Sequence, residues 1–209
     1  METPTQFLGD TEKAMVALFR SIQELRKVEA DAPTPVMFCD CSEESFAEKY
    51  LAWQKVNSEA ISKSWSADKA WWSNFPSMSV LAGSILTIAY SGIEFFSPGP
   101  DKTITLPGSF KDHPKRKKFC RGRIISGVPL GFIIYAGRHQ FVHRYSNEPH
   151  DPTKEVFEHL VTHYLDGVRH PALDLSNDIL SNYALNYLDV IGWENCSAYL
   201  DDMKDMIGI

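Results

Sequence analysis

The feature that most constrains this chain is a run of mainly apolar side chains over residues 78–96. The run is about long enough to cross a membrane. However, it carries several hydroxyl groups and the carboxyl group of Glu94, and it lacks anchoring residues on both sides. A helix that is apolar nearly all round is buried on most of its surface. We therefore expect residues 78–96 to form the central core helix of a folded domain, with no contact with a membrane.

Other segments repeat apolar residues at the helical period. The helices expected from this pattern cover residues 5–30, 42–64, 120–147, 153–167, 175–190 and 196–206. Prolines at 33 and 35 end the first helix, Ser42 caps the helix at 42–64, and Pro129 kinks the helix at 120–147. We expect an all-α, up-down helical bundle in a single domain, with its core at about 42–170. The helix at 5–30 and the C-terminal helices within 171–209 would be extensions of that core.

Composition narrows the class of protein further. An apolar fraction of 44% and twelve Phe are enough for a sizeable core. The four cysteines have no framework spacing, and the N-terminus has no signal-peptide pattern, so reduced thiols in a cytoplasmic protein are expected. No pattern points to a cofactor. The formal net charge of −6 means that nucleic acid could bind only through a local basic surface.

One segment offers such a surface. Its cations are Lys111, Lys115, Arg116, Lys117, Lys118, Arg121 and Arg123, with Asp112 as the only acid among them. Cations grouped in this way contact a phosphate backbone, although a solvated loop has the same composition. The segment precedes the stretch around Arg138, which is described next. We therefore interpret the cations of the segment, together with Arg144, as RNA-binding residues.

That stretch follows a second apolar run at residues 124–136, and it reads Gly137-Arg138-His139-Gln140-Phe141-Val142-His143-Arg144-Tyr145. A guanidinium presents a fixed fork of donors to phosphate oxygens, and an imidazole moves protons near neutral pH. An arginine and a histidine at one fixed spacing arise often by chance. The tyrosine two positions after His143 makes the match more specific.

The segment Arg138–Tyr145 resembles the R-x4–6-H signature of the HEPN superfamily (higher eukaryotes and prokaryotes nucleotide-binding). His139 would fill the polar position after the arginine. The extended R-x4-H-x-Y form is similar to the toxin of HEPN–MNT toxin–antitoxin pairs, in which an antitoxin nucleotidyltransferase modifies the tyrosine, here Tyr145. The resemblance implies metal-independent RNA cleavage in a homodimer whose two motifs share one cleft. It also implies a toxin or anti-phage effector with an antitoxin or regulatory partner.

The residues suit that chemistry. RNA carries its own nucleophile, the 2′-hydroxyl, and His143 could take its proton or protonate the leaving 5′-oxygen. Arg138 would stabilise the additional charge on phosphorus. His139 and Tyr145 would support the site, although Tyr145 is also a candidate core residue. The structural alternative for Arg138 is an ion pair with Glu94, and such a pair would also orient the arginine if Arg138 is catalytic.

Two other functions fit the sequence. His139/His143 and His159/His163 are spaced four apart, as in a helical-bundle metalloprotein that binds its metal on one helix face. A non-catalytic HEPN-like module that binds RNA, a nucleotide or a protein would keep the fold without the cleavage.

A separate aromatic cluster is expected to pack at a helix junction, with a base-stacking platform as the alternative. Its members are Trp65, Trp71, Trp72 and Phe75.

Overall fold

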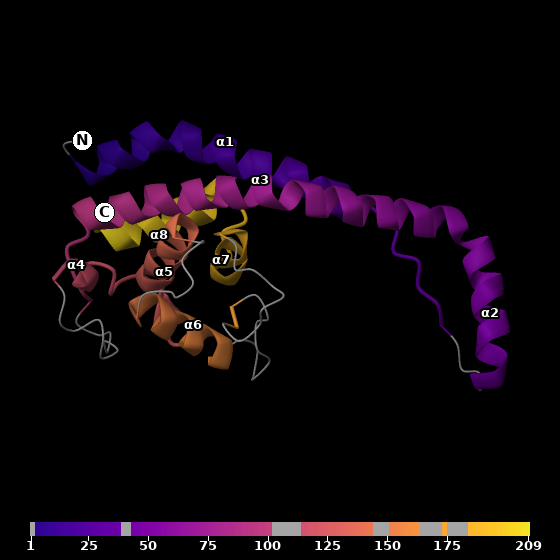
Figure 1. The fold of residues 1–209 in the computed structure, drawn as a ribbon. Helices are drawn as coiled ribbons and strands as arrows, with labels where there is room; N and C mark the ends of the chain where they lie inside the picture. The colour runs from indigo at the N-terminus through magenta and orange to yellow at the C-terminus, as the bar shows by residue number, and fades with distance from the viewer. Residues whose placement is uncertain (1–2, 39–42, 102–113, 144–150, 164–172, 175–183) are drawn as a thin grey trace. The chain divides into compact units, whose positions relative to one another are not determined.

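A computed structural model of the chain describes residues 3–38, 43–101, 114–143, 151–163, 173–174 and 184–209. The described chain is mostly helical and has one two-stranded hairpin (Figure 1), which confirms the expected all-α class. The chain forms two compact units, one of Met1–Arg20 with Ser79–Ile209 and one of Ser21–Met78. The single domain that the sequence suggests, and its core limits, stay predictions.

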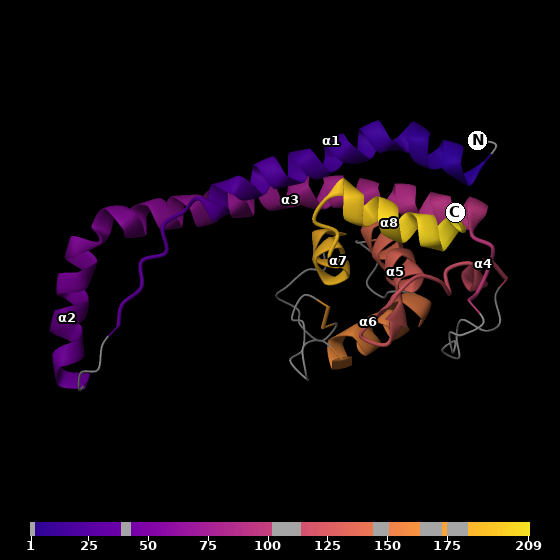
Figure 2. The same cartoon turned by 180° about the vertical axis from the view of Figure 1, so that it is seen from behind.

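Two long helices enter the first unit, α1 (Pro4–Ala30) and α3 (Ser58–Phe96). Within this unit they run antiparallel and side by side, as Figures 1 and 2 both show. The ring of Phe7 near the start of α1 lies 5.6 Å from that of Phe96 at the end of α3. The observed bounds of α1 agree with the expected helix at residues 5–30 to within one residue.

One face of the C-terminal part of α3 is buried, whereas Val80 and Phe95 are 52% and 64% exposed, so the helix is not buried on most of its surface as its composition predicts. Its side chains at Ala82, Ile85, Leu86, Ala89 and Ile93 are at most 1% exposed. Among the described residues, α3 is also the one helix long and apolar enough to cross a membrane, a test that the core helix of a soluble protein passes as well. The burial of these five side chains agrees with a core helix in the first unit.

The sequence predicts a break between the helix at 42–64 and the helix at 78–96, and the position of this break is wrong. Helix α2 (Glu43–Val56) ends before Asn57, and α3 starts at Ser58 and continues through Pro76. The side-chain amide of Asn57 donates to the carbonyl of Trp53 at 2.9 Å, which competes with continued helix. Pro76 removes only one helical hydrogen bond, and the helix continues on both sides of it.

The expected helix over residues 120–147 is wrong in its first part. Strands β1 (Ile124–Ile125) and β2 (Val128–Pro129) form an antiparallel hairpin, and α5 (Leu130–Val142) starts only after it. Gly127, at a φ of 80°, gives the left-handed backbone that the reversal requires. Pro129 precedes the first turn of α5 and does not kink it, since its fixed φ suits a helix start.

The remaining helices are α4 (Pro114–Lys117), α6 (Asp151–His163), α7 (Ala184–Ile191) and α8 (Cys196–Ile207). The last three agree with expected helices, although residues 164–172 and 175–183 lie outside the described parts. In the first unit α5 packs against both α6 and α7. The Asn195 side chain caps α8 by accepting from the N–H of Ala198 at 3.0 Å, and Gly208 ends the helix at a φ of 77°.

Candidate functional site

Two glycines bring α5 close to α3 and so position the Arg138 segment. A Cβ added to Gly83 of α3 would overlap the ring of Phe141 on α5. A Cβ on Gly137 would lie 2.9 Å from the Tyr187 ring and 3.1 Å from Leu86. These distances leave no room for a side chain at either position without a shift, so α5 packs this closely against α3 and against Tyr187 of α7 because both residues are glycine.

An aromatic cluster lies between these helices, on the side of Arg138. The ring of Tyr90 on α3 lies 4.8 Å from that of Phe119 and 6.0 Å from that of Tyr135 on α5. The Tyr135 ring is in turn 4.3 Å from the imidazole of His139. Neither tyrosine was predicted as a site residue. The signal for Tyr135 was its spacing from His139 and His143, four residues apart on one helix face, and no such spacing marks Tyr90.

Arg138 rests on this cluster through its guanidinium, whose carbon lies 4.8 Å from the centre of the Tyr90 ring. This is a cation–π contact, which holds the guanidinium against the ring. The Nε atom of Arg138 is buried and has no hydrogen-bond partner among the described residues. The arginine side chain as a whole is half-buried, so part of it remains open to a ligand.

The expected ion pair between Glu94 and Arg138 is not found in the described part of the chain. The backbone carbonyl of Glu94 accepts a hydrogen bond from the Lys118 ammonium at 2.6 Å. Burial, with smaller effects from Glu94 and Tyr135, raises the pKa of the Tyr90 hydroxyl, and Arg138 opposes that rise. The charge of Glu94 therefore affects the pKa of Tyr90, and a supporting role for Glu94 at the site stays a prediction.

The two histidines of the segment share one face of α5, as their spacing predicts. Their ring centres are 6.0 Å apart, and the ring planes differ by 21°. His139 is half-buried against Tyr135, whereas His143 is exposed at the C-cap of α5. Positions five apart on a helix differ by about 140° around its axis, so His143 leaves the helix in a different direction from Arg138. Tyr145 and Arg144 lie outside the described residues.

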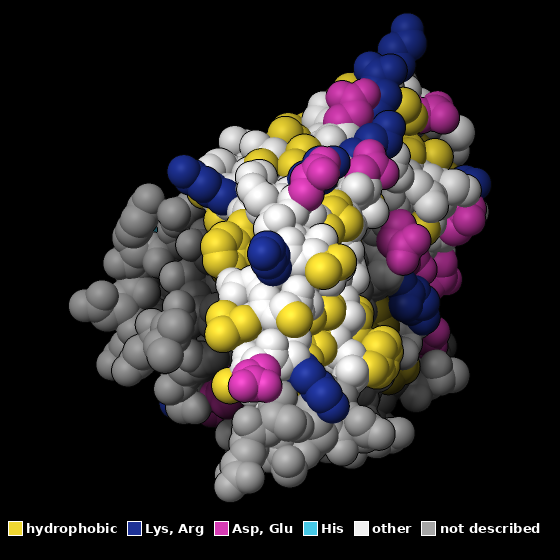
Figure 3. Space-filling model, turned by 90° about the vertical axis from the view of Figure 1, so that its right-hand side faces the viewer, with side chains coloured by type: hydrophobic (Ala, Val, Ile, Leu, Met, Phe, Trp, Pro, Cys, Tyr) yellow, Lys and Arg dark blue, Asp and Glu magenta, His cyan; other side chains and the backbone are white. Residues whose placement is uncertain are grey.

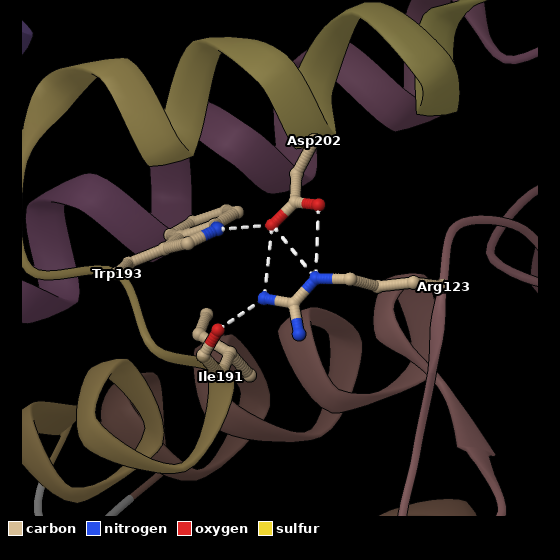
Figure 4. Close-up of polar contacts among 4 residues, drawn as sticks. All are labelled: Arg123, Ile191, Trp193 and Asp202. Carbon is tan, nitrogen blue, oxygen red and sulfur yellow. Dashed lines mark hydrogen bonds and ion pairs between the residues drawn. The ribbon is translucent and has the colours of Figure 1, made fainter.

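Several cations of the predicted RNA-binding segment form hydrogen bonds with other residues of the same chain. The Arg123 guanidinium donates to the Asp202 carboxylate at 3.0 Å and also bonds the carbonyl of Ile191 (Figure 4). Arg121 donates to the carbonyl of Asp205 at 2.7 Å. Both arginines therefore fasten the hairpin region to the end of α7 and to α8, which leaves them less available to phosphate.

The other predicted phosphate contacts differ in position. Lys118 is bound to the carbonyl of Glu94, Arg116 is half-buried, and Lys117 is exposed. The side chain of Lys115 lies outside the described residues, so its role stays a prediction. The α8 partners of Arg121 and Arg123, which are the backbone carbonyl of Asp205 and the carboxylate of Asp202, were not predicted, and no local pattern in the sequence points to them.

The metal alternative lacks a ligand group in the described ranges. No cluster of three or more His, Cys, Asp or Glu residues there is arranged to hold a metal ion. His139 and His143 are a pair without a third ligand of that kind, and the side chain of His163 lies outside the described residues. Three protein ligands are the usual minimum for a catalytic zinc.

Comparisons with known proteins identify no relative. The chain matches no protein-family model, no curated protein and no solved structure. What the site does is therefore inferred from its own residues, chiefly the Arg138 guanidinium over Tyr90 and the exposed imidazole of His143 on the same helix.

Proposed function

We propose that this protein is an endoribonuclease that cleaves RNA without a metal ion. In this proposal His143 is the general acid/base, and Arg138 stabilises the negatively charged pentacoordinate phosphorus. The observation that supports it best is the state of Arg138, a guanidinium held over Tyr90 with a buried Nε that has no partner among the described residues. A buried polar group without a partner is rare and destabilising, and a ligand commonly explains it.

An anionic ligand fits this guanidinium better than a neutral one. Arginine keeps its charge, and its donors match two oxygens of a phosphate at once. The contact with the Tyr90 ring restricts the arginine side chain before the ligand arrives, so less rotamer entropy is lost on binding. A phosphodiester would accept hydrogen bonds from the part of the guanidinium that stays exposed, and it would gain negative charge beside this cation as the reaction proceeds.

His143 supplies the proton transfer. Its imidazole is exposed at the end of α5, within reach of a substrate from solution. One imidazole accepts the proton of the 2′-hydroxyl as this oxygen attacks phosphorus, and the bond from phosphorus to the 5′-oxygen breaks. A protonated imidazole then gives its proton to the leaving 5′-oxygen. The products are a 2′,3′-cyclic phosphate and a 5′-hydroxyl, and no water is consumed.

A homodimer would complete the site. Because Arg138 and His143 leave one helix in directions that differ by about 140°, a single chain does not surround a phosphate with both groups. A two-fold axis next to the C-terminal end of α5 would bring both residues of each copy into one cleft. It would also provide the second imidazole that acid and base catalysis require together.

The biological role that we propose is that of a toxin or an anti-phage effector, either released from an antitoxin or activated by a regulatory partner. This part of the proposal rests on the resemblance of residues 138–145 to the HEPN signature. In the toxin–antitoxin form, Tyr145 would be the residue that the antitoxin modifies.

The experiment is incubation of purified wild type and His143→Ala with total RNA in EDTA, followed by gel analysis and by mapping of the RNA ends. We expect cleavage by wild type only, with cyclic phosphate ends. His159→Ala, which removes an exposed histidine of α6, is the matched control and should cleave as wild type does. Absence of cleavage by wild type would favour the binding module, and cleavage abolished by EDTA would favour the metalloprotein.

A further inference from the structure

The unit Ser21–Met78 contains a small pocket that the proposed cleavage chemistry does not use. Its volume is about 290 Å³. Three aromatic side chains, Tyr50, Trp53 and Trp65, line it together with the carboxylate of Asp68. The volume lies at the lower limit for ligand pockets, so it suits one small head group better than a nucleotide or a larger molecule.

The pocket is built where two helices meet. Helix α2 contributes Tyr50 and Trp53, which are three residues apart and therefore on one face. Helix α3 contributes Trp65 and Asp68 with the same spacing, and the extended segment after α1 adds Pro35. The change of direction at the junction of α2 and α3, visible in Figure 1, lets these two faces line one space.

Two of the three rings lie nearly parallel, and the third has no ring contact with them. The rings of Tyr50 and Trp53 are nearly parallel, with centres 6.0 Å apart and planes 25° apart. Trp65 is 68% exposed and makes no ring contact with that pair within the described residues. A tryptophan this exposed buries little of its apolar surface, and exposed tryptophans are typical of ligand and partner sites. In Figure 3, which faces the side where α2 lies in Figure 1, hydrophobic side chains are at the surface among charged ones.

The charge of the unit favours a cation as the ligand. Residues 21–78 contain nine Asp and Glu against six Lys and Arg. Asp68 makes no hydrogen bond or ion pair with any other described residue, so its carboxylate is available to a ligand. An acidic unit repels a phosphate backbone, which argues against these rings as a platform for stacking RNA bases.

We propose that this pocket binds an organic cation, namely a methylated ammonium group. The faces of Tyr50, Trp53 and Trp65 carry negative electrostatic potential and attract a cation near the ring centres. Asp68 adds a full negative charge at the same pocket. Methyl groups on the cation contact the rings while the positive charge is stabilised, which is why aromatic walls select such groups over small hydrated ions. The ligand comes either as a side chain of a peptide or as a free small molecule.

The test is an NMR titration of the full chain with tetramethylammonium chloride, at constant ionic strength, followed at the indole N–H signals of Trp53 and Trp65. We expect saturable shifts of these two signals. Neopentyl alcohol, a neutral molecule of similar shape, should bind several-fold more weakly because it lacks the charge. A peptide with trimethyl-lysine that binds more tightly than tetramethylammonium identifies a peptide side chain as the source, and choline binding as tightly as the peptide identifies a free cation.

Three variants complete the experiment. Trp65→Ala should weaken binding about fivefold, as expected for the loss of one cation–π wall, and Asp68→Asn should weaken it by a similar factor. Trp72→Ala removes another exposed tryptophan of α3 that does not line the pocket, and it should bind as wild type does. Non-saturable shifts, equal binding of the neutral molecule, or an unchanged affinity of Trp65→Ala would overturn the proposal. So would binding of poly(U) at these two indoles in preference to the cation.

Discussion

Replacing Asp202 by alanine should destabilise the protein more than any other change to an acid of α8. Its carboxylate accepts from the Arg123 guanidinium at 3.0 Å and from the Trp193 indole N–H at 2.7 Å (Figure 4). Trp193 is only 2% exposed, so water does not replace the lost acceptor easily. The change therefore leaves one buried donor and one cation without their partner.

The magnitude follows from these two contributions. A buried N–H left without an acceptor costs about 1–3 kcal/mol. The ion pair is partly exposed, with Arg123 at 47% and Asp202 at 17%, so its loss adds about 1 kcal/mol at most. Together they give about 2–4 kcal/mol. For a chain of this length each kcal/mol corresponds to a shift in Tm of roughly 2–4 °C, so we expect Tm to fall by about 5–15 °C.

The assay is urea unfolding followed by tryptophan fluorescence, together with a thermal melt. Asp201→Ala is the matched control because Asp201 is the adjacent acid on α8, is 73% exposed, and pairs only with exposed Lys204 at 3.6 Å among the described contacts. Its loss should change the free energy of unfolding by about 0.5 kcal/mol or less. Asp202→Asn, which keeps an acceptor for Trp193, should lie between the two. Equal losses for Asp201→Ala and Asp202→Ala would refute the reasoning.

Further predictions concern glycine packing and alkaline pH. Gly131→Ala should prevent stable folding because its Cβ would overlap the backbone oxygen of Phe119, whereas Gly9→Ala, which meets nothing within 4 Å on α1, should stabilise the chain by about 1 kcal/mol; urea unfolding of the pair checks this. Burial raises the pKa of the Cys120 thiol from 9.0 to about 12. The unfolded chain then loses this proton first, so stability should fall from about pH 9 toward pH 12 by up to about 1.4 kcal/mol per pH unit. Urea midpoints measured across this range should show a shallower fall for Cys120→Ala, and an identical slope would contradict the prediction. Iodoacetamide at pH 8 should leave Cys120 unlabelled until urea is added, as peptide mapping would show, and rapid labelling of the native protein would contradict its burial.

The helices could be predicted where the local pattern decides the structure. The limits of α1 and α8, and the end of α3 at Phe96, follow from apolar periodicity and from breakers such as Pro98. The pattern failed at residues 120–129, because an apolar run with glycines fits a helix and a hairpin equally well. It also failed at Pro76, where helix on both sides outweighs the loss of one hydrogen bond.

The site was predictable only in part. The shared face of His139 and His143 follows from helical spacing alone. The contact of Arg138 with Tyr90 depends on how α3 and α5 pack, which local patterns do not contain. For the same reason, a count of charges could not predict the pairing of Arg123 with Asp202, which are 79 residues apart.

The most direct test of the central claim is the rate of RNA cleavage in EDTA by wild type, Arg138→Lys, His143→Ala and the double variant. If the guanidinium and the imidazole act on one phosphate, each single change lowers the rate by about a hundredfold or more. The double variant then loses little beyond the worse single variant, because the two groups work as a unit. A wild type that cleaves no RNA, or single variants that cleave as fast as wild type, would contradict the account.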